Sequence, residues 1–349
     1  MRLPDFQNDT WALAAAERLQ DIVDEPLWTE YFEFYCFDKK SGIGTNVHIG
    51  RESYDMSLWR ATVSTFLPND ELLVAKVFGR QVGQWTLTLG ALTVSCVVPG
   101  QLWSLTYCGS AQRVTRQRNA AEAHRDGIDE PLEFNVAMQG AAPLWDLRSS
   151  IGDANSYSRM HTQQVCRATG IVTAAGHTNW IDGAGMRDHS SGARDYSKVE
   201  GDFWLSALFP DGRALMAQIV ELTDSITNTG YVYWGDRTGL ETISVVEAPV
   251  VPNRRMPARS VPHDLLAQES TRVFSTTIKT ARGLARINAR ALHAASTMFI
   301  APSFEAFGTD PARIDELQWT LAAVEVEWDG QIGTGVRERI SPIRVLDLP

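Results

Sequence analysis

The sequence of 349 residues predicts an all-β protein, and three observations carry that prediction. Apolar and polar side chains alternate with a period of two, most clearly over residues 84–107, as they do in half-buried strands. Gly, Pro and Asp interrupt these short runs at close intervals, which is typical of strands joined by tight turns. Helical and strand patterns do not alternate along the chain. The sequence therefore favours a barrel or sandwich over an α/β fold.

The length of the chain predicts two domains. Each half, at roughly 150–180 residues, is large enough to bury its own core. The segment 141–158 is rich in Pro, Gly, Asn and Ser and is the predicted linker. We therefore place an N-terminal barrel at residues 1–158 and a C-terminal barrel at residues 159–349.

The N-terminal half is expected to begin with one short helix and to continue in strands. Asp9 and Thr10 can cap a helix that runs to about Val23. Residues 29–38 then alternate with both faces apolar or aromatic, so one face would meet a core and the other a lumen. Further strands are predicted at 58–66, within 84–107 and at 132–138.

The C-terminal half is expected to contain strands and one uncertain segment. A hairpin is predicted around Ala175 and Gly176, followed by a loop over residues 180–196 whose glycines would let the backbone bend. Residues 284–292 have helical spacing, but a barrel would impose strands there, and both interpretations stay open. The remaining predicted strands are 201–209, 214–222, 230–234 and 240–246.

Composition excludes several classes of protein. The net charge of −10 argues against nucleic-acid binding, which needs a basic face. No apolar run approaches the ~20 residues of a membrane helix, and the first residues lack a secretory pattern, so we expect a cytoplasmic protein with no membrane span. The cysteines show no Cys-x-x-Cys spacing and are expected to be buried thiols. The histidines match no compact metal motif and no nucleotide fingerprint is present, so neither a metal nor a cofactor is expected.

The stretch 180–196 contains the strongest candidates for catalytic residues in the sequence. Two Arg-Asp pairs, 187–188 and 194–195, flank His189, so they could hold the backbone by bidentate bonds while one carboxylate orients the imidazole. Two interpretations stay open. The pairs either position His189 for proton transfer or only clamp a tight corner, because ion-pair networks often mimic sites.

This stretch also resembles a known family. The run Gly-x-Gly-Met-Arg-Asp-His-Ser-x-Gly-x-Arg-Asp is similar to a signature of the superfamily of carotenoid hydratases (hydroxyneurosporene synthases) and AttH-like proteins. The likeness extends to residues 28–38, Gly42-Ile-Gly44, His48-Ile-Gly50, Trp59, 324–330, Gly333-x-Gly335 and Glu338. The resemblance implies two lipocalin-like antiparallel β-barrels in tandem with short helices. A homodimer is possible.

The resemblance also implies a chemistry. In the carotenoid hydratases the matching Asp-His segment lines a cavity, with aromatic residues and an acid that protonates an alkene. Hydration of an alkene, or dehydration of a tertiary alcohol, passes through a carbocation and needs a neutral carboxylic acid, aromatic faces and a positioned water. We therefore predict a cofactor-independent hydratase or dehydratase that acts on an apolar small molecule. The predicted catalytic residues are Asp188, His189 and Asp195, and the predicted substrate-binding residues are Tyr35, Trp59, Trp180, Arg187, Ser191, Arg194, Trp204 and Gln218.

Two positions depart from the family pattern. Ser191 stands where the hydratases usually have Trp, and Gln218 lies where a later strand usually supplies an acid, with Glu221 three residues further on. A terpenoid, steroid or phenolic would suit these changes better than a carotenoid. Two other functions stay open. Lipocalin-like barrels can carry hydrophobic ligands without any chemistry, and a cavity can also guide an isomerisation or a pericyclic cyclisation by its shape.

Overall fold

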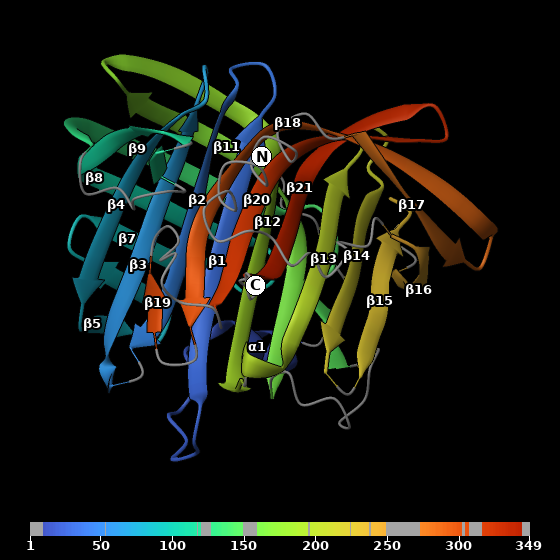
Figure 1. Cartoon of the computed structure of the whole chain (residues 1–349), viewed down its shortest axis with the longest axis horizontal. Coiled ribbons are helices and arrows are strands. Elements are labelled where there is room, and N and C mark those ends of the chain that lie inside the picture. The colour runs from blue at the N-terminus through green and yellow to red at the C-terminus, as the bar shows by residue number, and fades with distance from the viewer. Residues whose placement is uncertain are drawn as a thin grey trace, which may run out of the picture.

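The computed structural model describes residues 10–52, 54–116, 118–119, 127–148, 159–194, 196–223, 225–236, 239–248, 273–301, 304–306 and 316–343. Almost all regular structure in these ranges is β (Figure 1). The helix α1 (Thr10–Glu17) and the 3-10 helix η2 (Tyr196–Lys198) are short. In the described part of the chain, no helix is both long enough and apolar enough to cross a membrane. The predicted all-β class is confirmed.

The first sheet closes into a barrel, which we call barrel 1. Eight strands pair in an antiparallel circuit, β1-β2-β3-β4-β8-β9-β11-β12 and back to β1. Closure leaves these strands without free edges. The strands of this sheet are β1 (Trp28–Asp38), β2 (Ile43–Glu52), β3 (Asp55–Leu67), β4 (Glu71–Gly79), β5 (Gln81–Gly83), β6 (Thr86–Leu89), β7 (Leu92–Val98), β8 (Leu102–Thr115), β9 (Ile128–Gly140), β10 (Trp145–Asp146), β11 (Met160–Ala174) and β12 (His177–Ala193).

The second sheet closes in the same way into barrel 2. Its circuit is β13-β14-β15-β16-β17-β18-β20-β21 and back to β13. The segment 284–292 lies in a strand, so the barrel context outweighs its helical spacing. The strands are β13 (Val199–Leu208), β14 (Ala214–Leu222), β15 (Ile226–Tyr233), β16 (Leu240–Glu247), β17 (Val273–Thr280), β18 (Gly283–Ala301), β19 (Phe304–Ala306), β20 (Glu316–Trp328) and β21 (Gln331–Ile343). The prediction of two antiparallel barrels in tandem is confirmed.

Strand pairing extends barrel 1 beyond the predicted boundary at residue 158. Strands β11 and β12 pair with β9 and β1, so the first sheet continues to Ala193. The predicted hairpin is present, with positive φ angles of 49° at Ala175 and 76° at Gly176. The predicted loop that follows is wrong, because residues 180–193 all belong to β12. At Gly185 a Cβ would lie 2.8 Å from the carbonyl oxygen of Tyr35, so this glycine permits close approach of β1 and does not serve a bend.

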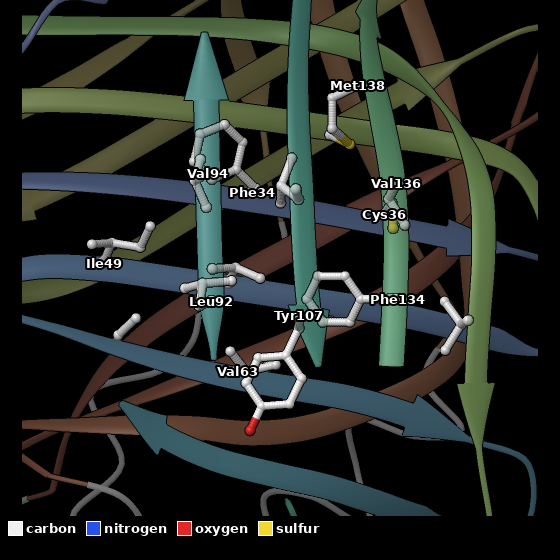
Figure 2. Packing of buried hydrophobic residues seen from close by; sticks show 14 of the residues in the cluster. Phe34, Cys36, Ile49, Val63, Leu92, Val94, Tyr107, Phe134, Val136 and Met138 are labelled. Atoms are coloured by element: carbon white, nitrogen blue, oxygen red, sulfur yellow. The ribbon is translucent and has the colours of Figure 1, made fainter. Parts of the chain in front are cut away.

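The buried side chains form three clusters. One fills barrel 1 and includes Phe34 and Cys36 of β1 together with Phe134 and Val136 of β9 (Figure 2). A second fills barrel 2. The third lies between the barrels, and we call it the inter-barrel layer; it includes Tyr35, Met186, Trp204, Met216, Trp319, Val336 and Ile340. Strands β13 and β21 of barrel 2 pack there on β1, β11 and β12. Since side chains alternate along a strand, β1 and β12 give one face to barrel 1 and the other to this layer.

Close packing of β21 on β13 makes one glycine sensitive to substitution. A Cβ on Gly335 would overlap the carbonyl oxygen of Ser206 and lie 2.8 Å from the Cα of Ala207. We expect Gly335→Ala to lower the free energy of unfolding by roughly 1–3 kcal/mol in urea titrations, because the two strands must move apart. The control is Gly201→Ala, since the nearest atom to its new Cβ is 3.8 Å away. Equal losses for both variants would contradict this account.

Candidate active site

The predicted site residues within the stretch 180–196 point to two opposite faces of β12. Successive side chains of a strand point in opposite directions, so Arg187 and His189 share one face and Asp188 lies on the other. His189 stacks on Phe32 inside barrel 1, with ring centroids 3.8 Å apart and 14° between the ring planes. Met186, on the same face as Asp188, packs in the inter-barrel layer. Asp188 therefore does not orient His189, and Arg187 does not pair with Asp188.

His189 is fully buried beneath α1. Its Nδ1 donates to the carbonyl oxygen of Ala16 at 2.8 Å, because a carbonyl can only accept, and its Nε2 lies 3.0 Å from Oε1 of Glu30. Glu30 also accepts a bond of 2.9 Å from Nε of Arg51. Arg51 in turn lies over the ring of Trp59, 4.3 Å from its centroid. These contacts connect α1 to the inside of barrel 1.

Arg187 makes a second connection to the same helix. It forms an ion pair with Glu17 at the end of α1, and the side chains are 1% and 0% exposed respectively. Nε of Arg187 donates to Oε1 of Gln164 at 3.0 Å. Glu17 also accepts a bond of 2.6 Å from the indole nitrogen of Trp103. A buried charge of each sign is thus neutralised within barrel 1.

On the other face of β12, Asp188 pairs with a histidine that the sequence did not point to. Its Oδ2 lies 2.5 Å from Nε2 of His161 on the neighbouring strand β11, and it accepts a bond of 2.8 Å from Gln163. Burial pushes the pKa of Asp188 upward, but the charge and hydrogen bond of His161, together with the charge of Arg194, outweigh burial and lower that pKa. Asp188 is therefore an ionised carboxylate in the inter-barrel layer.

Two carboxyl groups of barrel 2 reach the same layer in the opposite protonation state. Glu338 on β21 lies directly opposite Trp204 on β13, and Asp202 precedes Trp204 by two residues on the same face. Burial raises the pKa of Asp202 to about 8, and repulsion from Asp188 adds to this rise. Burial also raises the pKa of Glu338 well above its usual range, with further repulsion from Glu33, Asp202 and Asp188. At neutral pH both groups are neutral carboxylic acids beside an ionised one.

Aromatic rings and unpaired polar atoms accompany these acids. Gln218, Trp204 and Glu338 form a row across β14, β13 and β21. Within the described ranges, Oδ1 of Asp202, Nε1 of Trp204 and Oε1 of Gln218 are buried without a hydrogen-bond partner. Buried polar atoms are nearly always paired, so these three are available to water or to a ligand. The geometry supports proton transfer next to an indole ring.

The structure divides the predicted site residues into groups. The inter-barrel layer holds Tyr35, Asp188, Trp204 and Gln218, and the interior of barrel 1 holds Trp59, Arg187, His189 and Ser191. Arg194 is buried and donates to the hydroxyl of Tyr196 at 3.2 Å. Trp180 is 78% exposed near the hairpin end of β12, so the prediction that it lines a cavity is wrong. Asp195 lies outside the described residues.

Sequence reasoning missed the partners that complete both networks. His161, Asp202 and Glu338 in the inter-barrel layer were not predicted as site residues. Asp202 has no distinguishing local signal, because a second acid, Glu200, lies only two residues before it in the same strand. Over the described residues, no group of three or more His, Cys, Asp or Glu side chains is arranged to hold a metal ion.

Comparisons with known proteins agree with this architecture. A family model described as a domain of unknown function, DUF7064, matches residues 14–342. A solved structure assigned as AttH from Nitrosomonas europaea is similar at 16% identity and a TM-score of 0.55, over 92% of this chain and 94% of that chain. The structure of CghA is similar at 12% identity and a TM-score of 0.51. The structure of CghA with Sch210972 is similar at 10% identity and a TM-score of 0.50. Each match covers 91% of this chain and 89% of that chain. No curated protein matches the sequence. These likenesses confirm the predicted fold.

Proposed function

The chain belongs to the DUF7064 family, and from this premise we propose that it is a small-molecule enzyme whose inter-barrel layer performs acid–base catalysis without a cofactor. One observation carries the proposal. A neutral Glu338 carboxyl lies close enough to the ionised Asp188 carboxylate for that charge to help raise the pKa of Glu338, in a buried layer that contains indole rings. Pairs of titratable groups with opposed protonation states are typical of acid–base sites.

The reaction that these groups fit best is hydration of an alkene, or the reverse dehydration of a tertiary alcohol. Glu338 donates its proton to one alkene carbon, and the positive charge that develops on the other carbon is stabilised by the face of Trp204. Water adds to the cation and loses a proton to Asp188, whose negative charge is held by His161. A proton relay back to Glu338 completes the cycle. The substrate is an apolar terpenoid, steroid or phenolic, because large apolar side chains such as Met186, Trp204 and Trp319 lie in the same layer as the acids.

The neutral acid has a physical advantage in this role. A carboxyl group of ordinary pKa is ionised at neutral pH and cannot donate a proton to carbon. Burial in the inter-barrel layer keeps Glu338 protonated, and the unpaired atoms of Asp202 and Gln218 offer positions for the attacking water. The structure of CghA with Sch210972 supports a small molecule as the ligand of this fold.

The proposal is tested with purified protein, terpenoid alkenes and tertiary alcohols in heavy-oxygen water. We expect label in the alcohol, and we expect Glu338→Gln to reduce turnover by roughly 10²–10⁴-fold, the usual contribution of a general acid. Asp188→Asn should reduce it as well. The matched control is Glu133→Gln on an exposed position of β9, which should retain wild-type turnover.

The pH profile gives an independent readout. Activity should fall as pH rises and the acids of the layer ionise, with Asp202 losing its proton near pH 8. If the product carries no label and Glu338→Gln forms it as fast as the wild type, hydration is contradicted. The reaction would then be an isomerisation or a cyclisation guided by the shape of the cavity. Binding without turnover of any of these compounds would favour a carrier.

A further inference from the structure

A cavity of about 600 Å³ opens at one end of barrel 1. Three adjacent strands contribute residues to it, Trp28 at the start of β1, Met160 at the start of β11 and Ser191 near the end of β12. Met160 and Ser191 lie directly opposite each other in the sheet. The helix α1 supplies Ala15 and Ala16 to the facing wall. The volume falls within the range of roughly 300–1,000 Å³ that is typical of small-molecule sites.

The helical wall of this cavity is held in place from inside the barrel. The carbonyl oxygen of Ala16 accepts a bond of 2.8 Å from His189, and the backbone nitrogen of Gln20 donates at 2.7 Å to Glu30. Ala16 and Gln20 both line the cavity, whereas the side chains of His189 and Glu30 are 0% exposed. A site whose walls are fixed before binding loses little conformational entropy when a ligand enters.

The cavity is separate from the inter-barrel layer. Thr162 and Ser191 line it, whereas Gln163 and Asp188 on the same two strands point to the other face of the sheet. The paired backbones of β11 and β12 therefore lie between a ligand here and the acids of the layer.

The charged groups at this cavity favour an uncharged ligand. The guanidinium of Arg148 donates two bonds to Asp146, at 3.3 and 3.0 Å, and that of Arg159 lies 2.8 Å from Glu25. Asp21, which is exposed, adds a negative charge to the wall. An anion would have to displace a carboxylate from an arginine and would be repelled by Asp21. A neutral molecule leaves these ion pairs intact.

We propose that the end of barrel 1 is a second, non-catalytic binding site for an uncharged and largely apolar small molecule that carries a hydroxyl or carbonyl group. Trp28, Leu144 and Met160 contact its apolar body. The hydroxyls of Thr162 and Ser191 bind its polar group. This site does not depend on the acids of the inter-barrel layer.

The test uses Nile red, an uncharged fluorescent probe, with the full-length protein. We expect saturable binding of one probe per chain. Ala15→Trp should weaken binding at least tenfold, because an indole at this exposed position of the cavity wall occupies the space. Leu284→Trp adds the same ring at an exposed position of barrel 2 and should leave binding unchanged. Asp202→Asn should also leave it unchanged, which separates this site from the catalytic proposal.

Two further measurements complete the test. Anilinonaphthalene sulfonate, an anionic probe, should bind at least tenfold more weakly than Nile red. In a Cys108→Ser background, where the remaining cysteines are buried, Ala15→Cys introduces a thiol whose alkylation should be slowed severalfold by Nile red. The proposal is overturned by absence of Nile red binding to the wild type, by equal binding to Ala15→Trp, by tighter binding of the anion, or by no protection at position 15.

Discussion

Arg187→Ala is expected to lower the free energy of unfolding by roughly 3–5 kcal/mol, the usual cost of removing one partner from a buried ion pair. The substitution leaves the Glu17 carboxylate without its cation, although that side chain is 0% exposed. It also removes the hydrogen bond to Gln164 and the contact of the guanidinium with Trp103. Urea unfolding at neutral pH, followed by circular dichroism, measures the loss.

A matched arginine on the same sheet provides the control. Arg167 on β11 pairs with Asp182 on β12, but the side chains are 52% and 63% exposed. Arg167→Ala should therefore cost less than about 1 kcal/mol. The double variant Arg187→Met with Glu17→Met should be more stable than Arg187→Ala, because it removes both buried charges. A loss for Arg187→Ala no larger than that for Arg167→Ala would contradict the assignment of a buried pair.

Stability is expected to fall as pH rises from about 4 to about 8, because Asp202 has a raised pKa in the folded protein. Its ordinary pKa is 3.8 and the folded value is about 8, so between these values the folded state binds the proton and the unfolded state does not. The stabilisation is fully present below the unfolded pKa and is lost as pH rises toward the folded one. The difference in the free energy of unfolding amounts to a few kcal/mol, with about 6 kcal/mol as its upper bound.

Comparison with Asp202→Asn isolates this contribution. The asparagine cannot ionise, so the difference in unfolding free energy between wild type and variant should shrink or reverse as pH rises through this window. Asp188 does not obscure the result, because its pKa is lowered and its stabilising effect disappears only as pH falls below the ordinary carboxyl range. Parallel pH curves for the two proteins would show that Asp202 is ionised throughout.

The fold could be predicted because period-two alternation is a local property of the sequence. Residues 29–38 showed two apolar faces, and β1 does supply one face to barrel 1 and the other to the inter-barrel layer. The turn at Ala175 and Gly176 was equally local. The stretch after it does not form the predicted loop, because Gly183 and Gly185 do not serve a bend. Their role is close approach between strands, which depends on a partner strand about 150 residues away.

The site could be predicted only in part, since its acids have no local signature. Glu327 and Glu338 both lie in strands, the first between Val326 and Trp328 and the second between Arg337 and Arg339. The first is bonded to Asn288 on an exposed face, whereas the second is buried against barrel 1. Which of the two is buried depends on how the barrels pack, and sequence alternation does not contain that information. Asp188 and His189 lie on opposite faces of β12, and a prediction of a loop at these positions contains no information about faces.

The two-sided use of β12 also restricts how relatives of this protein can diverge. Deletion of one residue between positions 178 and 186 would reverse the direction of every later side chain in the strand. Arg187 and His189 would then face the acids of the inter-barrel layer, and Asp188 would face the inside of barrel 1. Changes of length here are therefore tolerated only in steps of two residues. At the hairpin tip, where a side chain on Gly176 would meet nothing within 4 Å, insertions of any length can accumulate.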